Sequence, residues 1–153
     1  MHLAVATDHR GIALKEEIVR WLEAAGHEVR DFGCHGGAAV DYPAYAVAVA
    51  QCVAAGEAER GVLICGTGIG MSIAANKVKG ALAALVYDED SLRLSRQHNN
   101  ANILVLPGNW LEAEEACRWL ALWLELPFDG GRHARRVGQI LDYEAGRAPE
   151  GGA

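Results

Sequence analysis

The sequence predicts an α/β fold of three layers (α/β/α), in which helices cover both faces of a Rossmann-like, five-stranded parallel sheet. Five short apolar segments alternate with segments of helical periodicity along the chain. The apolar run at residues 62–64 is unbroken, as a parallel strand covered on both faces requires. Right-handed crossovers leave the carboxyl ends of such strands at one edge of the sheet, where ligands bind.

Two strands and two helices are expected in the first half of the chain. Leu14, Ile18 and Leu22 have helical spacing, and Gly26 provides a C-terminal stop. The run Asp41-Tyr42-Pro43 indicates a second helix start, because proline favours the first turn of a helix. The predicted strands cover residues 3–7 and 27–32, the helices cover residues 14–25 and 44–55, and a loop covers residues 33–40.

Three further strands are expected after residue 60, each followed by a helix. The predicted strands cover residues 62–64, 81–87 and 103–106, and the helices end near residues 77, 97 and 126, with a last short helix from about 129 to 143. Trp119 and Trp123 are four residues apart and therefore share one helix face. Together with the apolar helix at residues 44–55, this face predicts at least a dimer, because a small monomer rarely exposes so much apolar surface.

The length and the net charge of the chain limit its domain organisation and its possible partners. The 153 residues suit a single domain, residues 1–153, with a frayed tail at about residues 147–153. The formal net charge of −6 argues against a nucleic acid or an acidic membrane as the partner. We therefore expect a small-molecule ligand, and an anionic ligand would need a local cluster of basic side chains and backbone N–H groups.

The cysteine pattern indicates free thiols. Cys34, Cys52, Cys65 and Cys117 form no CxxC pair and no Cys/His spacing typical of a zinc site. A reducing compartment and no metal are therefore expected. We find no charged leader before an apolar core and no segment of about 18 apolar residues, which predicts a cytoplasmic protein without a membrane partner.

The turn after the third predicted strand is the strongest functional signal. Cys65 ends the strand, and glycines follow at every second position, Gly66, Gly68 and Gly70. Such a turn lets the backbone approach a ligand and directs N–H groups at an anion, and the following helix start favours a thiolate. Cys65 is therefore a candidate base or nucleophile beside an oxyanion site. The alternative interpretation is a small buried cysteine before a tight turn.

The glycine turn alone also resembles other phosphate sites. A dinucleotide fingerprint would need a small residue in place of Met71, although Asp88 lies at the expected distance, so this match is partial. A Walker loop is excluded because no Gly-Lys-Ser/Thr follows. A cysteine phosphatase would need an arginine that closes the loop, and none occurs before Lys77.

Two histidines and a basic helix start add candidate groups. His9 and His98 lie among polar turn residues, which favours acid/base or binding roles over burial in the core. Arg132 and Arg136 are four apart and project from one helix face, so with His133 they can form a phosphate clamp. The alternative is a solvated basic turn. At the carboxyl edge of the sheet, we expect the residues after the first strand, the Cys65 turn and the segment leading into the last strand to assemble.

With these residues in view, the chain resembles the B-type ribose-5-phosphate isomerases, whose family also contains galactose-6-phosphate and allose-6-phosphate isomerases. The motifs span nearly the whole chain in the family's order, which is far more specific than any one of them. They are Asp8-His9-x-Gly11, Asp41-Tyr42-Pro43, CGTGIGMSIAANK from Cys65 to Lys77, His98-Asn99-x-Ala101-Asn102, and GGRHARRV from Gly130 to Val137.

The resemblance implies interconversion of an aldose phosphate and a ketose phosphate without a metal or an organic cofactor. Cys65 would move the proton between C1 and C2 through an enediolate. The backbone of residues 66–70, with Thr67, would stabilise the oxyanion. His98, with Asp8, would help to open the furanose ring.

The same resemblance implies a set of substrate-binding residues. Tyr42 and Asn99 would hold sugar hydroxyls, and His9, Arg132 and Arg136 would hold the phosphate. In this family the site is completed across a dimer interface, so a homodimer or a dimer of dimers is implied.

The chain departs from the family pattern at two positions. Arg10 stands where a small residue is usual, and Asn109 stands where many members carry a phosphate-facing arginine. Members that use a glutamate base carry it where this chain has Met71, which supports the cysteine route. The preferred sugar thus stays open between ribose 5-phosphate and a hexose 6-phosphate. A phospho-ligand or nucleotide-binding module and a thiol-dependent hydrolase are the remaining alternatives.

Overall fold

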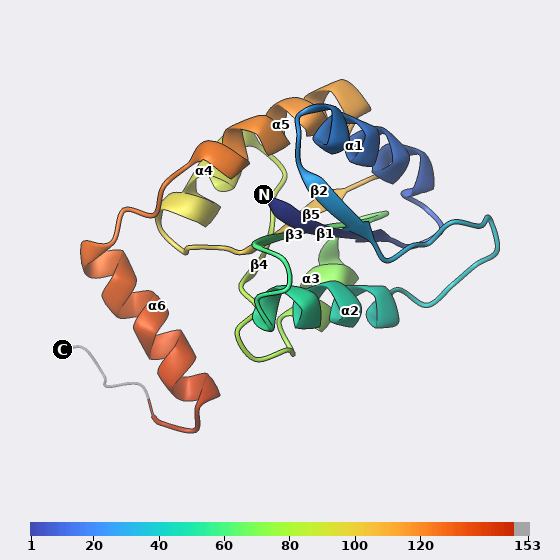
Figure 1. Ribbon diagram of the computed structural model, residues 1–153. Helices are drawn as coiled ribbons and strands as arrows, with labels where there is room; N and C mark the ends of the chain where they lie inside the picture. Colours follow the sequence, from blue (N-terminus) through green and yellow to red (C-terminus); the bar gives the residue numbers. More distant parts are fainter. Residues whose placement is uncertain (149–153) are drawn as a thin grey trace.

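A five-stranded, all-parallel sheet forms the centre of the protein, as the computed structural model of residues 1–148 shows (Figure 1). The spatial order of the strands is β2-β1-β3-β5-β4. The strands are β1 (His2–Thr7), β2 (Glu28–Asp31), β3 (Arg60–Cys65), β4 (Ala83–Leu85) and β5 (Ile103–Pro107). The predicted fold class is therefore confirmed.

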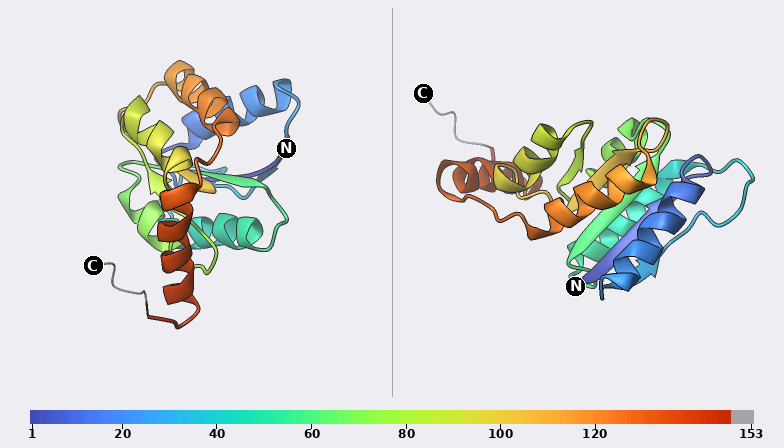
Figure 2. Two further views of the ribbon diagram at one scale, coloured as in Figure 1. Left: turned by 90° about the vertical axis from the view of Figure 1, so that its left-hand side faces the viewer. Right: turned by 90° about the horizontal axis from the view of Figure 1, so that it is seen from above.

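Helices cover both faces of this sheet (Figures 1 and 2). The helices are α1 (Ile12–Ala24), α2 (Tyr42–Ala54), α3 (Ile69–Ala75), α4 (Glu89–Gln97), α5 (Ala113–Glu125) and α6 (Gly131–Glu144). One apolar core joins α1, α4 and α5 to the sheet, and a second joins α2 and α3 to the opposite face. Because β3 and β5 are buried on both sides, they consist of nearly continuous apolar residues.

Helix α6 extends away from the layered body (Figures 1 and 2). His133 and Val137 are its buried residues, whereas Ile140, Leu141 and Tyr143 expose 40 to 70% of their surface. Glu144 near its end accepts a hydrogen bond from the Gly80 N–H at 2.8 Å. The predicted frayed tail lies mostly at residues 149–153, which are outside the described residues.

Strand β4 is shorter than predicted, and two asparagine side chains bond the backbone at its start. Asn76 accepts from the N–H of Ala83 and donates to its carbonyl, at 2.9 and 2.8 Å. Asn102 accepts from the Leu82 N–H at 2.8 Å. The strand covers three residues instead of the seven predicted at residues 81–87.

The prediction that Trp119 and Trp123 form an exposed apolar face was wrong. Both belong to the core between α5 and the sheet, with 4% and 0% exposure, and the Trp123 indole donates to Ser95 Oγ at 3.0 Å. The apolar helix α2 also buries residues from Ala46 to Val53 against the sheet. Across residues 1–148, no helix is both long and apolar enough to cross a membrane.

Replacing Trp123 by phenylalanine should lower the free energy of unfolding by about 1–3 kcal/mol, because it leaves a cavity and removes the bond to Ser95. Urea denaturation of purified protein measures this change. Trp110→Phe is the matched control, since Trp110 is 64% exposed and its loss should cost less than about 0.5 kcal/mol. Equal effects of the two substitutions would contradict the core assignment.

Candidate active site

Cys65 ends β3 at the carboxyl edge of the sheet and is 5% exposed. The Gly68 N–H donates to its Sγ at 3.2 Å. Gly68 has φ of 78°, a left-handed conformation that favours glycine, and a Cβ there would lie 2.3 Å from Leu85. A backbone N–H directed at sulfur stabilises negative charge on it. The turn thus holds Cys65 in an environment suited to a thiolate.

Gly70 lets a tyrosine lie directly against the same turn. A Cβ at Gly70 would be 2.4 Å from Cζ of Tyr42 and 2.8 Å from its hydroxyl oxygen. Tyr42 begins α2 and is 39% exposed, so this residue is partly open to solvent beside the turn. The structure therefore brings together two of the residues expected at the site.

Asp8 and His9 follow β1, which pairs with β3 through Thr7 and Ile64. Asp8 is buried, and its Oδ1 accepts the Arg10 N–H at 2.8 Å. The Val40 N–H donates to His9 Nδ1 at 3.3 Å. In a neutral His9 the proton then lies on Nε2, so this histidine presents a donor to a ligand.

Thr67 is held on both sides by residues that sequence analysis did not select. Its Oγ1 accepts the Ile69 N–H at 3.3 Å, and its carbonyl accepts the Tyr87 hydroxyl at 2.9 Å. The Tyr87 ring packs against Trp110, with centroids 6.2 Å apart. Both aromatic residues come just after a strand, β4 or β5, and this position was the available signal.

A second group of predicted site residues surrounds His98, which caps α4. The rings of His98 and His133 stack, with centroids 3.9 Å apart and 9° between their planes. Asp129 Oδ2 lies 3.9 Å from His98 Nε2, and the Asp129 N–H donates to the Gln97 carbonyl at 3.0 Å. The start of α6 is thereby fixed against the end of α4.

Arg96 fixes the loop that carries His98 and Asn99, and sequence analysis missed it. Its Nη1 donates to the Ala101 carbonyl at 2.6 Å and to Asn100 Oδ1 at 3.0 Å. Burial, with a smaller effect of the nearby Arg60 charge, lowers the pKa of Arg96 to about 10. The guanidinium therefore stays charged at neutral pH and holds Asn100 in its left-handed conformation, with φ of 50°.

The surroundings of His133 suit an anion better than a metal ion. His98, Asp129 and His133 offer ligand atoms within 4.8 Å of one another, a spacing that a metal could bridge. However, Arg132 Nε donates to His133 Nε2 at 3.3 Å. Burial lowers the pKa of His133, and the charges of His98, Arg132 and Arg136 add to this effect. The neutral ring therefore accepts from Arg132 in a positively charged surrounding.

The two groups lie at opposite edges of the sheet, which corrects the expected assembly at one edge. In the β3–β5 register, Cys65 pairs with Pro107 and Gly61 pairs with Ile103. His98 precedes Ile103, so it lies beyond the amino end of β5. Four residue steps along a strand already span about 13 Å. One chain therefore brings Cys65 near Asp8 and Tyr42, but not near His98, Asn99 or the basic start of α6.

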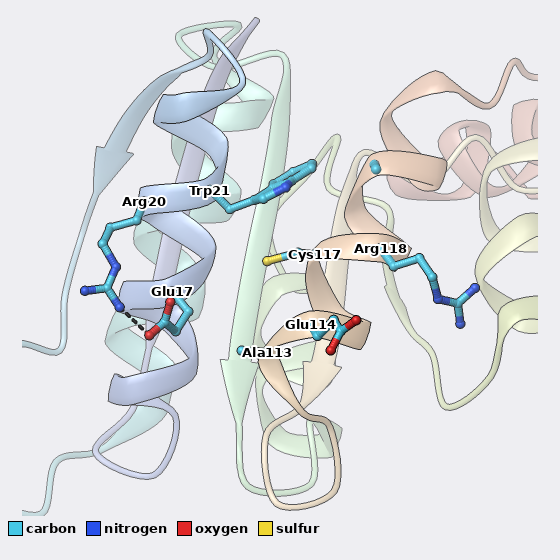
Figure 3. Close-up of a pocket in the computed structure, with 8 residues that line it drawn as sticks. Glu17, Arg20, Trp21, Ala113, Glu114, Cys117 and Arg118 are labelled. Atoms are coloured by element: carbon cyan, nitrogen blue, oxygen red, sulfur yellow. Dashed lines mark ion pairs between the residues drawn. The ribbon is translucent and has the colours of Figure 1, made fainter.

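A groove of about 570 Å³ between α1 and α5 contains none of the predicted site residues (Figure 3). Trp21 and Cys117 point into it from the two helices. Burial and the nearby Glu17 raise the pKa of Cys117, so this cysteine is a protonated thiol at neutral pH. The groove lacks the grouped basic residues that would bind an anion.

Comparisons with known proteins agree over nearly the whole chain. A family described as Ribose/Galactose Isomerase matches residues 3–140. Ribose-5-phosphate isomerase B of Escherichia coli is 44% identical over 95% of this chain and 97% of its own length. The structure of ribose-5-phosphate isomerase B from Clostridium thermocellum has a TM-score of 0.93 and 46% identity, covering 95% of this chain and 99% of that chain. The Mycoplasma genitalium enzyme with bound ribulose-5-phosphate has a TM-score of 0.91 and 42% identity, covering 94% and 96%.

Gly70→Ala should destabilise the protein by about 1–3 kcal/mol, because the added methyl group overlaps the Tyr42 ring. In a Tyr42→Ala background the same substitution should cost much less. A double-mutant cycle from urea denaturation measures this coupling. Gly138→Ala on α6 is the control, since no atom lies within 4 Å of its added methyl group. Additive effects of the Gly70 and Tyr42 substitutions would contradict the contact.

Proposed function

The chain belongs to the Ribose/Galactose Isomerase family, and from this we propose that it interconverts ribose 5-phosphate and ribulose 5-phosphate. It is an aldose–ketose isomerase, in line with the names of its relatives and with the ribulose-5-phosphate complex of the M. genitalium enzyme. The four free thiols, Cys34, Cys52, Cys65 and Cys117, support a place in the reducing cytoplasm.

The observation that best supports this proposal is the hydrogen bond from the Gly68 N–H to the Cys65 sulfur. In the proposed reaction, the Cys65 thiolate removes the proton from C2 of the open-chain aldose. The electron pair of that C–H bond forms the C1=C2 double bond, and O1 takes the negative charge. The hydroxyl proton moves from O2 to O1, and the Cys65 thiol returns its proton to C1, which gives the ketose.

The remaining roles are proposed from the family resemblance. Thr67 and the N–H groups of residues 66–70 stabilise the enediolate oxygens. Tyr42 and Asn99 hold sugar hydroxyls. His98, with Asp8, moves the proton that opens the furanose ring.

Phosphate binding is assigned to basic groups from both edges of the sheet. His9 donates through Nε2, as its contact with Val40 requires. Arg132 and Arg136 supply charge-assisted hydrogen bonds, and the neutral His133 orients Arg132.

A complete site needs two copies of the chain, because each copy separates Cys65 from His98. A two-fold dimer that places the His98 edge of one subunit over the Cys65 edge of the other would form two complete sites. Exposed apolar side chains support this arrangement at both edges: Ile69 and Ile73 lie on α3 beside the Cys65 turn, and Ile140 and Leu141 lie on the projecting α6. Burial of these side chains between subunits would stabilise the dimer.

Cys65→Ser should retain folding and substrate binding but lower kcat by about 10²–10⁴-fold or more, because a hydroxyl is too weakly acidic to act as the base at neutral pH. Conversion of ribose 5-phosphate to ribulose 5-phosphate measures the loss. Cys117→Ser, in the groove between α1 and α5, is the matched control and should retain normal turnover. Near-normal turnover of the Cys65→Ser enzyme would contradict the assignment.

The same assay decides between the remaining functions. Allose 6-phosphate and galactose 6-phosphate tested beside ribose 5-phosphate give the preferred sugar. A hydrolase would release inorganic phosphate, which an isomerase does not. A binding module would show neither reaction.

Subunit complementation tests the shared site. Cys65→Ser and His98→Ala chains should each be nearly inactive, but a heterodimer of the two contains one site with neither substitution. Random mixing of equal amounts should therefore restore up to about one quarter of wild-type activity. Mass spectrometry under native conditions confirms that heterodimers have formed.

The matched control combines Cys65→Ser with Asp8→Asn, two substitutions at the same edge. Every site in that heterodimer carries one substitution, so activity should stay low. Recovery in the control, or none in verified heterodimers of Cys65→Ser and His98→Ala, would overturn the proposed arrangement.

A further inference from the structure

Arg10 is a cation without a partner at the Cys65 edge of the sheet. It is exposed, and within residues 1–148 its guanidinium forms no ion pair or hydrogen bond. Several other surface arginines are neutralised, since Arg20 pairs with Glu17 and Arg118 pairs with Glu89. Within residues 1–148, the exposed Arg135 and Arg136 on α6 also form no ion pair, but they lie far along the chain from the Cys65 turn. An unpaired arginine beside a candidate anion site is available to bind a ligand.

The Arg10 side chain lies over the beginning of the glycine turn. A Cβ added at Gly66 would be 3.1 Å from Cδ of Arg10 and 3.2 Å from the amide atoms of Asn109. The Asn109 N–H donates to the Gly66 carbonyl at 3.0 Å, which fixes the Asn109 backbone beside the turn. Arg10 and Asn109 therefore border the same space next to Cys65.

The backbone of Arg10 is also fixed. Its N–H donates to Asp8 Oδ1 at 2.8 Å, and the Gly11 N–H donates to the Asp8 carbonyl at 3.4 Å. This turn places Arg10 directly after His9, whose Nε2–H is free to donate. Two adjacent residues thus offer hydrogen-bond donors at the Cys65 edge, and one of them has a permanent positive charge.

We propose that Arg10 binds the phosphate group of the substrate, from the same subunit that supplies Cys65. This inference rests on the proposed function, which places Arg132 and Arg136 on the other subunit. A phosphate monoester carries a charge of about −1.5 to −2 at neutral pH and offers three acceptor oxygens. Arg10 and His9 engage it from one side of the interface, so phosphate recognition does not depend on the partner subunit alone. Asn109 carries no charge, so Arg10 supplies the positive charge beside the turn.

Phosphate affinity measured without turnover is the first test. Titration of the wild-type dimer with inorganic phosphate in a calorimeter gives Kd, and Arg10→Ala should raise it by about 10–100-fold, as expected for the loss of a charge-assisted hydrogen bond. Arg20→Ala is the matched control, since Arg20 lines the groove between α1 and α5. Equal Kd values for Arg10→Ala and the wild type would overturn the inference.

Turnover provides the second test. Arg10→Ala should raise KM for ribose 5-phosphate by a similar factor while kcat changes only a few-fold, because the phosphate is bound alike in the ground state and the transition state. A fall in kcat with unchanged KM would overturn the inference.

A rescue variant locates the positive charge. An arginine at position 109 can reach the same space beside Gly66. The double variant Arg10→Ala/Asn109→Arg should therefore bind phosphate at least tenfold more tightly than Arg10→Ala. Failure of this rescue in a folded dimer would contradict the shared position. If the wild type isomerises no sugar phosphate, the proposed function fails, whereas the calorimetric comparison still decides the role of Arg10.

Discussion

The parallel register between β3 and β5 is the constraint on which the rest of the site depends. In a parallel sheet, every strand ends at one edge and begins at the other. Cys65 is the last residue of β3, whereas His98 comes before the first residue of β5. Rotation of side chains cannot bring two groups together when they are separated by the length of a strand. In the proposed function, joining the two groups therefore takes a second copy, and the activity would be a property of the assembly.

The glycine turn acts within this constraint by bringing a backbone N–H to Cys65 and by letting two side chains lie against the turn. Gly68 gives its N–H to the sulfur, and its left-handed backbone would be strained with any other residue. Gly70 admits the Tyr42 ring, and Gly66 admits the stem of Arg10. The same absence of side chains that exposes N–H groups to a substrate also lets neighbouring elements form the walls of the site.

The sequence was informative where a local pattern determines the structure. The order of strands and helices follows from apolar periodicity, and the cysteine before alternating glycines marks the centre of the proposed site. The start of β5 at Ile103 was predicted, but only the parallel register shows that His98, which precedes it, lies at the edge opposite Cys65. At the start of β4, the side chains of Asn76 and Asn102 accept backbone N–H groups, and apolar periodicity does not predict such contacts.

Other features depended on what covers a side chain, and a single sequence does not contain that information. Trp119 and Trp123 share a helix face as expected, but that face packs on the sheet. Arg96 looked like an ordinary helical arginine, yet it is buried and supports the loop that carries His98. Periodicity identifies which residues lie together on an element, whereas the topology decides what lies opposite.

Charge explains how an acidic protein can bind an anionic sugar phosphate. The formal net charge is −6, so attraction cannot come from the protein as a whole. Ion pairs such as Arg93–Glu89 neutralise basic residues on the outer helices. Basic groups that remain near the proposed site, Arg10 and the Arg132–His133 pair, lie at opposite edges of the sheet. In the proposed dimer, the positive potential that a phosphate requires would become concentrated where the two subunits meet, and dimer formation would supply substrate binding as well as the catalytic residues.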